Sequence, residues 1–152
     1  MRIFFDTEFT QLRDDAELIS IGLVDETGQN VFYAEVLGVE VAECSAFCRE
    51  SVLPLLEHGD VELPLDQLRK SLFAWLCAQG PATLVCDSPR DAMQLSRLFP
   101  EGLPGTYKVH VVGFWTNARR RLLNFGRRLH RRHGLRVHHA LDDAQANRIA
   151  LT

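Results

Sequence analysis

The order of hydrophobic and polar residues along the 152-residue chain predicts strands and helices that alternate. Short runs rich in β-branched and aromatic residues, bounded by turn residues, predict strands, whereas apolar residues three or four positions apart predict helices. The predicted strands span residues 3–9, 17–24, 31–36, 82–87 and 109–114. The predicted helices span residues 42–53, 65–79, 88–99, 116–133 and 142–151.

This order of elements is typical of an α/β fold. The first three strands are joined by short connections, which indicates an antiparallel start, and the later strands are separated by helices, which indicates parallel crossovers. We therefore expect one mixed five-stranded sheet with helices on both faces. The sequence contains no repeat, linker or low-complexity tract, so residues 1–152 are predicted to form a single domain.

Composition argues against several other classes of protein. No run approaches the roughly 18 apolar residues of a membrane span, and Asp6 interrupts the apolar region that a signal peptide would need. The four cysteines form no C-x-x-C pair and lie among apolar neighbours, which favours reduced thiols over a disulfide framework or a zinc site. We therefore expect a cytoplasmic protein that is not embedded in a membrane.

The net charge of −3 conceals an acidic half and a basic half. Residues 1–66 carry 15 acidic and 3 basic side chains, a charge of −12. Residues 67–152 carry 5 acidic and 14 basic side chains, a charge of +9. An asymmetry of this kind can mark a protein that contacts nucleic acid.

Two acidic residues lie on one face of the first predicted strand. Asp6 and Glu8 are two positions apart, and side chains at that spacing point to the same side of a strand. Helices are predicted to cover that side, so two carboxylates there are costly unless a divalent cation compensates them. Taken alone, the D-x-E pattern is better explained by a strand end that emerges into water. The case for a cation site therefore depends on the rest of the chain.

Two further segments supply matching chemistry. Asp87 and Asp91 lie where a predicted strand ends and the next helix begins, and His138 precedes Asp143 in a loop that leads into the last helix. On its own, His138 is better explained as part of a surface loop. Together, four acids from three distant segments and one histidine make up an apparatus for two-metal hydrolysis of a phosphodiester bond.

The order of these motifs resembles a known enzyme family. The sequence FFDTEF, the strand–Asp–helix pattern at Asp91 and the H-x4-D pattern of His138 and Asp143 are similar to the three motifs of DEDDh 3′–5′ exonucleases. This branch of the ribonuclease H-like superfamily includes ribonuclease T, oligoribonuclease and the proofreading subunits of DNA polymerases. The chain length and the segment ELISIGLV look most like the small stand-alone bacterial exoribonucleases of the mycobacterial type. The resemblance implies a ribonuclease H-like fold.

The resemblance also implies roles for individual residues. Asp6, Glu8, Asp91 and Asp143 would hold two Mg²⁺ or Mn²⁺ ions through their carboxylate oxygens. His138 would accept the proton of the attacking water as a general base. The implied product is a nucleoside 5′-monophosphate released from the 3′ end.

The second motif departs from the family pattern. Arg90 stands directly before Asp91, where the family often has an aromatic residue, and Asp87 takes the position of an earlier polar residue. We predict Asp91 as the metal ligand and Asp87 as its supporting residue, and the reverse assignment stays open. His139 and Asp142 miss the spacing of the third motif by one position and are predicted to be neighbours of the catalytic pair.

Eight arginines lie between residues 119 and 136, and the seven within the predicted helix 116–133 give it a strongly cationic side. The eight are Arg119, Arg120, Arg121, Arg127, Arg128, Arg131, Arg132 and Arg136. One interpretation is a track for substrate phosphates, with contacts from four of them: Arg119, Arg120, Arg127 and Arg131. The other is a solvated helix face that balances the acidic half of the chain, within one molecule or across a homodimer contact.

The sequence leaves the substrate open. The resemblance places Phe9 beside the terminal nucleotide, where stacking on the 3′ base and simple packing are both compatible with the pattern. The leading hypothesis is a metal-dependent 3′–5′ exoribonuclease that acts on RNA 3′ ends or short oligonucleotides, and homodimers are common among the enzymes that it resembles. The alternatives are a 3′–5′ exonuclease of the proofreading or repair type that acts on single-stranded DNA, and a catalytically weakened nucleic-acid-binding module.

Overall fold

The structure of the chain is a computed structural model that describes residues 1–104, 107–112 and 130–152. Within these residues a six-stranded mixed sheet has the strand order β4-β3-β2-β1-β5-β6. The strands are β1 (Arg2–Phe9), β2 (Leu18–Asp25), β3 (Val31–Val36), β4 (Glu62–Leu63), β5 (Thr83–Cys86) and β6 (Lys108–Val111). The pairs β1–β2 and β2–β3 are antiparallel, whereas β3–β4, β1–β5 and β5–β6 are parallel.

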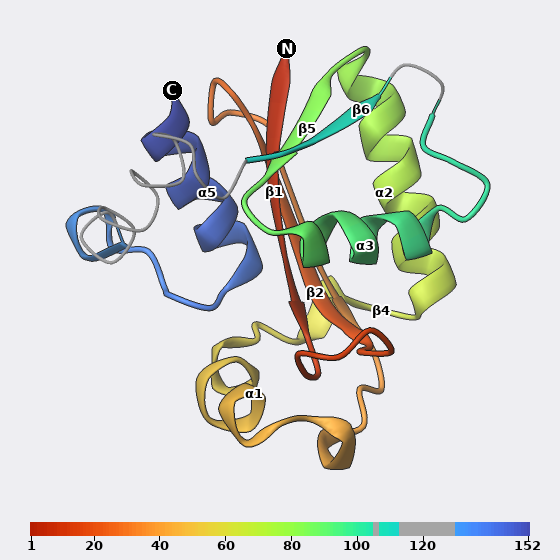
Figure 1. Ribbon diagram of the computed structural model, residues 1–152, viewed down its shortest axis with the longest axis vertical. Coiled ribbons are helices and arrows are strands. Elements are labelled where there is room, and N and C mark those ends of the chain that lie inside the picture. The colour runs from red at the N-terminus through yellow and green to blue at the C-terminus, as the bar shows by residue number, and fades with distance from the viewer. Residues whose placement is uncertain (105–106, 113–129) are drawn as a thin grey trace.

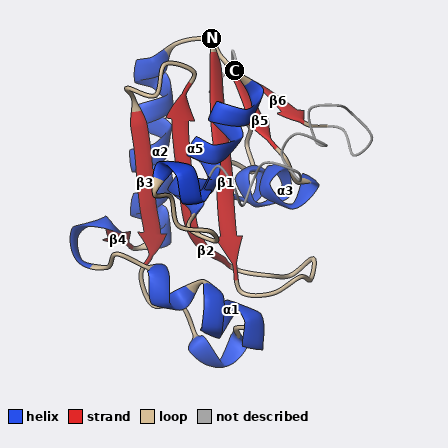
Figure 2. Cartoon of the chain, turned by 90° about the vertical axis from the view of Figure 1, so that its left-hand side faces the viewer, coloured by secondary structure: helices blue, strands red, loops and turns tan. Residues whose placement is uncertain are grey.

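Helices cover both faces of this sheet in the described part of the chain. The α-helices are α1 (Ala46–Ser51), α2 (Leu65–Gln79), α3 (Pro89–Leu98) and α5 (Ala140–Leu151). Figure 1 shows the sheet nearly edge-on, with α2 and α3 on one side and α5 on the other. Figure 2 shows α5 lying over β1 and β2. Within the described residues, no helix is both long enough and apolar enough to span a membrane.

Separate hydrophobic clusters fill the two faces of the sheet. Side chains alternate along β1, so Ile3 and Phe5 pack with α2 and α3, whereas Phe4 packs with Ala144 of α5. The buried residues of α2 lie four positions apart on one helix face: Leu68, Leu72 and Leu76. The same alternation assigns Asp6 and Glu8 to the α5 face of β1, and it assigns Thr7 to the face that α3 covers.

The sheet has six strands where the sequence pattern predicts five. The additional strand is β4, in which Glu62 and Leu63 pair in parallel with Glu35 and Val36. Two residues cannot show a periodic pattern, and Pro64 directly after them indicates only the start of a helix. This strand forms because the chain returns to lie beside β3, a pairing that local sequence does not encode.

The prediction of one helix over residues 42–53 is wrong. This stretch holds single 3₁₀ turns at Val41–Glu43 and Leu53–Leu55, with the six-residue helix α1 between them. Ser45 has an extended backbone, and its side chain accepts a hydrogen bond from the backbone N–H of Cys48 at 3.1 Å. A serine in this conformation begins a new helix, so the earlier turn cannot continue into α1.

The other predicted elements agree with the structure or lie outside its described part. The predicted strand 109–114 corresponds to β6, which begins and ends earlier. The last helix begins at Ala140, two residues before the predicted start. Most of the predicted basic helix 116–133 lies outside the described residues, and residues 130–133 at its end are helical.

The first turn of α5 lies close to β2 at Gly22. A Cβ atom at this position would lie 2.3 Å from the backbone N and Cα atoms of Leu141. That separation is far below van der Waals contact, so only glycine leaves room for the helix. Gly22 also pairs with Asp6 in the β1–β2 register. The close approach therefore brings the start of α5 beside the acidic residues of β1.

Candidate metal centre

One cavity of about 430 Å³ gathers the residues that the sequence motifs single out. Its lining includes Asp6, Glu8, Phe9, Asp87, Asp91, His138 and Asp143. Of the predicted substrate-binding arginines, Arg119, Arg120 and Arg127 lie outside the described residues. Arg131 is exposed and is not one of the residues that line this cavity. The structure thus brings the three motifs together and leaves the arginine track untested.

Asp91 is held by the strand that carries the first motif. The ladder between β1 and β5 ends at the pair of Phe4 and Val85, and β1 continues beyond it. Farther along β1, the backbone N–H and the hydroxyl of Thr7 both donate to Asp91 Oδ1, at 3.2 and 2.6 Å. Ser88 begins α3 by accepting a hydrogen bond from the backbone N–H of Arg90, which places Asp91 in the first turn.

The second oxygen of Asp91 gives the strongest structural argument for a cation site. Asp91 is 2% exposed, and its Oδ2 atom is buried without a hydrogen-bond partner among the described residues. A buried carboxylate oxygen without a partner is costly, and an ion or water at that point would satisfy it. This observation favours Asp91 as a ligand, which is the assignment predicted from the sequence.

The third motif is fixed by hydrogen bonds to Asp143. His138 has a left-handed backbone, with φ of 67°, and its backbone N–H donates to Asp143 Oδ2 at 3.0 Å. Its imidazole forms a T-shaped contact with the ring of Phe47 at a centroid separation of 4.9 Å and lines the cavity. A left-handed conformation is uncommon for residues other than glycine, and the bond to Asp143 helps to hold it.

The neighbours His139 and Asp142 have other contacts. Arg136 donates to Asp142 Oδ2 from both its backbone N–H and Nε, at 2.8 and 2.7 Å, and its Nη2 reaches Glu57 at 2.9 Å. His139 is 2% exposed and stacks on Tyr33 at a centroid separation of 4.5 Å. These contacts anchor the loop before α5 on both sides of His138.

The donor atoms fall into two groups, each compact enough for one cation. Asp6, Asp87 and Asp91 each offer one carboxylate oxygen, and the three oxygens lie within 4.8 Å of one another. Glu8, Asp143 and His138 form a second group with the same spread. Carboxylate oxygens are the ligands that Mg²⁺ and Mn²⁺ prefer. The donor set and the unpartnered Asp91 Oδ2 therefore fit a pair of divalent cations.

Burial and mutual repulsion disfavour the ionised forms of the acidic residues in the cavity when no cation is bound. Burial, reinforced by Asp143 and Asp91, raises the pKa of Glu8 to about 8. Burial, opposed by the hydrogen bond from Thr7 and aided by Asp87, raises the pKa of Asp91 to about 7. Burial and the surrounding carboxylates also raise the pKa of Asp6 well above its usual value. A bound cation would remove this penalty because it favours the ionised form.

We expect the stability of the metal-free protein to fall as the pH rises from 6.5 to 8.5. In this range the unfolded chain has already released the proton of Glu8, whereas the folded protein still holds part of it. Folding therefore takes up protons, and the free energy of unfolding decreases with pH, by on the order of 1–3 kcal/mol for this site. Thermal melts in EDTA measure the effect as a decrease in Tm of several degrees.

The variant Glu8→Gln is the control for this pH dependence. Glutamine has nearly the same shape but cannot ionise, so its Tm should vary less between pH 6.5 and 8.5. Mn²⁺ should raise the Tm of the wild type more at pH 8.5 than at pH 6.5, since proton release opposes cation binding at the lower pH. Parallel Tm curves for wild type and Glu8→Gln in EDTA would show that Glu8 does not titrate in this range.

A second expected result concerns Thr7. Replacing it by valine keeps the side-chain volume and removes the hydroxyl that donates to Asp91 Oδ1. Outer-shell partners of metal ligands typically change metal affinity 10- to 100-fold, so we expect Thr7→Val to weaken Mn²⁺ binding about tenfold in calorimetric titrations. Thr7→Ser retains the hydroxyl and serves as the matched control. Equal Mn²⁺ affinities for the two variants would contradict the positioning role of Thr7.

Three residues that shape the site are absent from the sequence-based set. Gly22 had a visible signal, because a glycine inside a strand pattern indicates a close backbone approach. Thr7 lies between two predicted ligands, but its partner Asp91 is 84 positions away. His130 Nε2 lies 2.5 Å from Asp143 Oδ1, and the position of His130 among arginines gives no sign of this contact.

Comparison of the sequence with protein-family models finds no match, and no curated protein matches it. The similarity to DEDDh exonucleases therefore remains a resemblance of motifs. Inferences about function rest on the residues that line this cavity.

Proposed function

We propose that the protein is a metal-dependent 3′–5′ exoribonuclease that releases nucleoside 5′-monophosphates from RNA 3′ ends or short oligonucleotides. The observation that carries the proposal is the convergence of Asp6, Glu8, Asp91 and Asp143 with the His138 imidazole in one cavity. These residues come from β1, α3, the loop before α5 and α5 itself. A sheet that places two of the acids on a central strand, with helices on both faces, supports the ribonuclease H-like fold that the motifs imply.

The two donor groups suggest which residues would bind each cation and which would accept a proton. The Asp6, Asp87 and Asp91 group would hold one Mg²⁺ or Mn²⁺. In the other group Glu8 and Asp143 would hold the second cation, and His138 would remain available as a base. Divalent cations, when bound, orient the scissile phosphate and lower the pKa of the attacking water. His138 lines the cavity, and its imidazole would accept the proton that this water loses.

Apolar side chains at the rim of the cavity could pack against the base of a nucleotide. Leu12 is 74% exposed and Phe47 is 56% exposed, and both line the cavity together with Phe9. Exposed apolar side chains beside a group of carboxylates allow a nucleobase to pack on them while its phosphate meets the cations. This arrangement supports a nucleic-acid end as the substrate.

Degradation of 5′-labelled RNA and DNA oligonucleotides, with Mg²⁺ or with EDTA, tests the proposal. We expect a ladder that shortens the RNA from its 3′ end in Mg²⁺ and no change in EDTA. Faster shortening of single-stranded DNA would identify the protein as a DNA exonuclease. If the wild type binds either oligonucleotide in a metal-dependent way but hydrolyses it no more than Asp6→Asn does, the enzymatic proposal is overturned. The protein would then be a binding module. Release of the labelled 5′ nucleotide at once, without a ladder, would overturn the polarity.

A further inference from the structure

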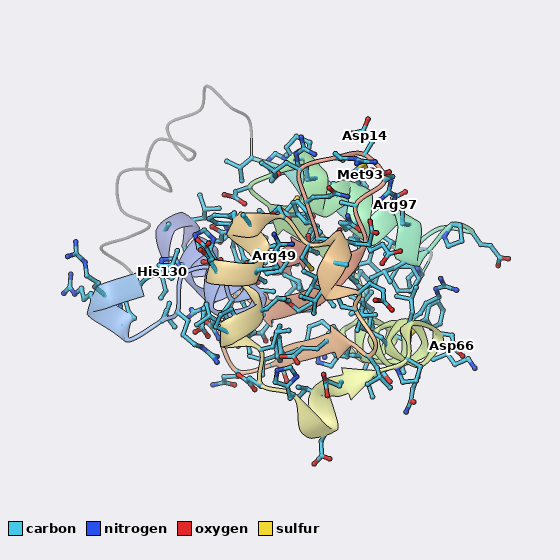
Figure 3. The ribbon with its side chains drawn as sticks, turned by 90° about the horizontal axis from the view of Figure 1, so that it is seen from below. Asp14, Arg49, Asp66, Met93, Arg97 and His130 are labelled. Atoms are coloured by element: carbon cyan, nitrogen blue, oxygen red, sulfur yellow. The ribbon has the colours of Figure 1, made fainter. Side chains whose placement is uncertain are left out.

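His130 is a buried histidine at the edge of the candidate metal centre. It belongs to the helical residues 130–133, which end at Gly134, where φ is 67°. The backbone N–H of Leu135 closes this turn on the carbonyl of His130 at 2.8 Å. Although Arg131 and His133 of the same turn are exposed, His130 is only 7% exposed. Figure 3 shows this turn beside α5, with His130 labelled.

The imidazole of His130 contacts one oxygen of Asp143. Its Nε2 atom lies 2.5 Å from Asp143 Oδ1, and the backbone N–H of His138 donates to Oδ2 at 3.0 Å. An ionised carboxylate only accepts hydrogen bonds, so a proton on Nε2 completes the pair. One donor on each oxygen fixes the plane of the carboxylate, and each oxygen keeps a further lone pair for a cation.

His130 and His138 have different positions relative to the cavity. The His138 ring lines the cavity and groups with Glu8 and Asp143. His130 instead meets Asp143 from the arginine-rich segment, whose neighbouring residue Arg131 is exposed. A single side chain therefore links the end of the basic segment to the carboxylate that the third motif supplies.

We propose that His130 is a positioning residue that holds the Asp143 carboxylate in the orientation that binds a divalent cation. The inference rests on the proposed function, since it assumes that Asp143 is a metal ligand. It adds to the sequence motifs a residue 13 positions before Asp143, outside the H-x4-D pattern. Because His130 belongs to the helical residues 130–133, the same contact joins this turn to Asp143.

The test compares His130→Leu and His130→Gln in the full chain. Leucine removes the contact and keeps an apolar side chain of similar size, whereas glutamine can place an amide N–H where Nε2 lies. We expect His130→Leu to weaken Mn²⁺ binding about tenfold or more in calorimetric titrations, and to lower kcat for RNA hydrolysis more than it changes KM. His130→Gln should restore most of both. His133→Gln, an exposed histidine of the same turn, is the matched control and should bind Mn²⁺ like the wild type.

The outcomes separate this inference from the proposed function. If the wild type binds no Mn²⁺ and hydrolyses no oligonucleotide, the proposed function fails. If the wild type binds Mn²⁺ and His130→Leu binds it equally well with the same kcat, the role of His130 is overturned and the proposed function stands. If His130→Leu does not fold, His130→Asn takes its place. The asparagine amide is too short to reach Asp143, so an Mn²⁺ affinity equal to that of His130→Gln would overturn the inference.

Discussion

Asp6→Asn is expected to abolish nuclease activity and, at the same time, to stabilise the metal-free protein. The first effect follows because Asp6 shares a donor group with Asp87 and Asp91, and asparagine contributes no negative charge to it. Removing one member of a catalytic group that acts as a unit commonly costs about 10³-fold or more in rate. The rate at which a 5′-labelled RNA is shortened measures this loss.

The second effect follows from the electrostatics of the cavity. Burial, with repulsion from Asp91 and Asp143, disfavours the ionised form of Asp6 in the folded protein. Asparagine removes that penalty, so the free energy of unfolding in EDTA at pH 8 should increase. For a chain of this size the Tm should rise by several degrees. Mn²⁺ should raise the Tm of the variant far less than that of the wild type.

Asp25→Asn is a matched control with the opposite effect on stability. Asp25 is also buried in the sheet, but its two oxygens accept hydrogen bonds from Thr27, Gly28, Gln29 and Asn30. Burial opposes ionisation of Asp25, yet these hydrogen bonds lower its pKa. Asparagine should therefore destabilise the protein by about 1–3 kcal/mol and leave hydrolysis close to the wild-type rate. If Asp6→Asn lowered the Tm as Asp25→Asn does, the carboxylate of Asp6 would be a structural group.

Local signals explain which elements the sequence predicts well. The helix over residues 65–79 coincides with α2, because Pro64 precedes its first turn and Gly80 ends it in a conformation with φ of 74°. The predicted start of the last helix, at Asp142, is two residues too late. The structure begins α5 after His139, whose side chain accepts a hydrogen bond from the backbone N–H of Asp142 at 3.4 Å.

In the candidate site, too, residues that are close in sequence are predicted well, whereas contacts between distant residues are not. Strand periodicity alone places Asp6 and Glu8 on one face of β1, and the short H-x4-D spacing links His138 to Asp143, so both pairs are visible in the sequence. The contacts that orient them join Thr7 to Asp91 and His130 to Asp143 across 84 and 13 positions. No spacing rule connects such residues, because the sheet and the packing of α5 determine which of them meet.

Gly22→Ala is expected to separate the two halves of the metal centre. The added Cβ would lie 2.3 Å from backbone atoms of Leu141, which cannot rotate away as a side chain could. Relief requires the first turn of α5 to move by roughly 1 Å or more from β2, since ordinary contacts are about 3.5–4.0 Å. Asp143 and His138 would move with this turn, whereas Asp6 and Glu8 stay on β1. A misplacement of about 1 Å can cost 10²-fold in rate, so we expect hydrolysis to fall at least that far.

The number of Mn²⁺ ions bound per chain tests directly whether Gly22→Ala separates the two donor groups. The Asp6, Asp87 and Asp91 group takes no ligand from α5 or the loop before it, so it should still bind one Mn²⁺ in Gly22→Ala. The Glu8, Asp143 and His138 group depends on the position of α5 and should lose its affinity. Calorimetric titration should therefore show two Mn²⁺ per chain in the wild type and one in the variant. Ile21→Val, a buried neighbour on the same strand, should cost about 0.5–1.5 kcal/mol of stability and keep both ions. Two ions bound to Gly22→Ala with wild-type affinity would mean that α5 tolerates the extra methyl group without moving its ligands.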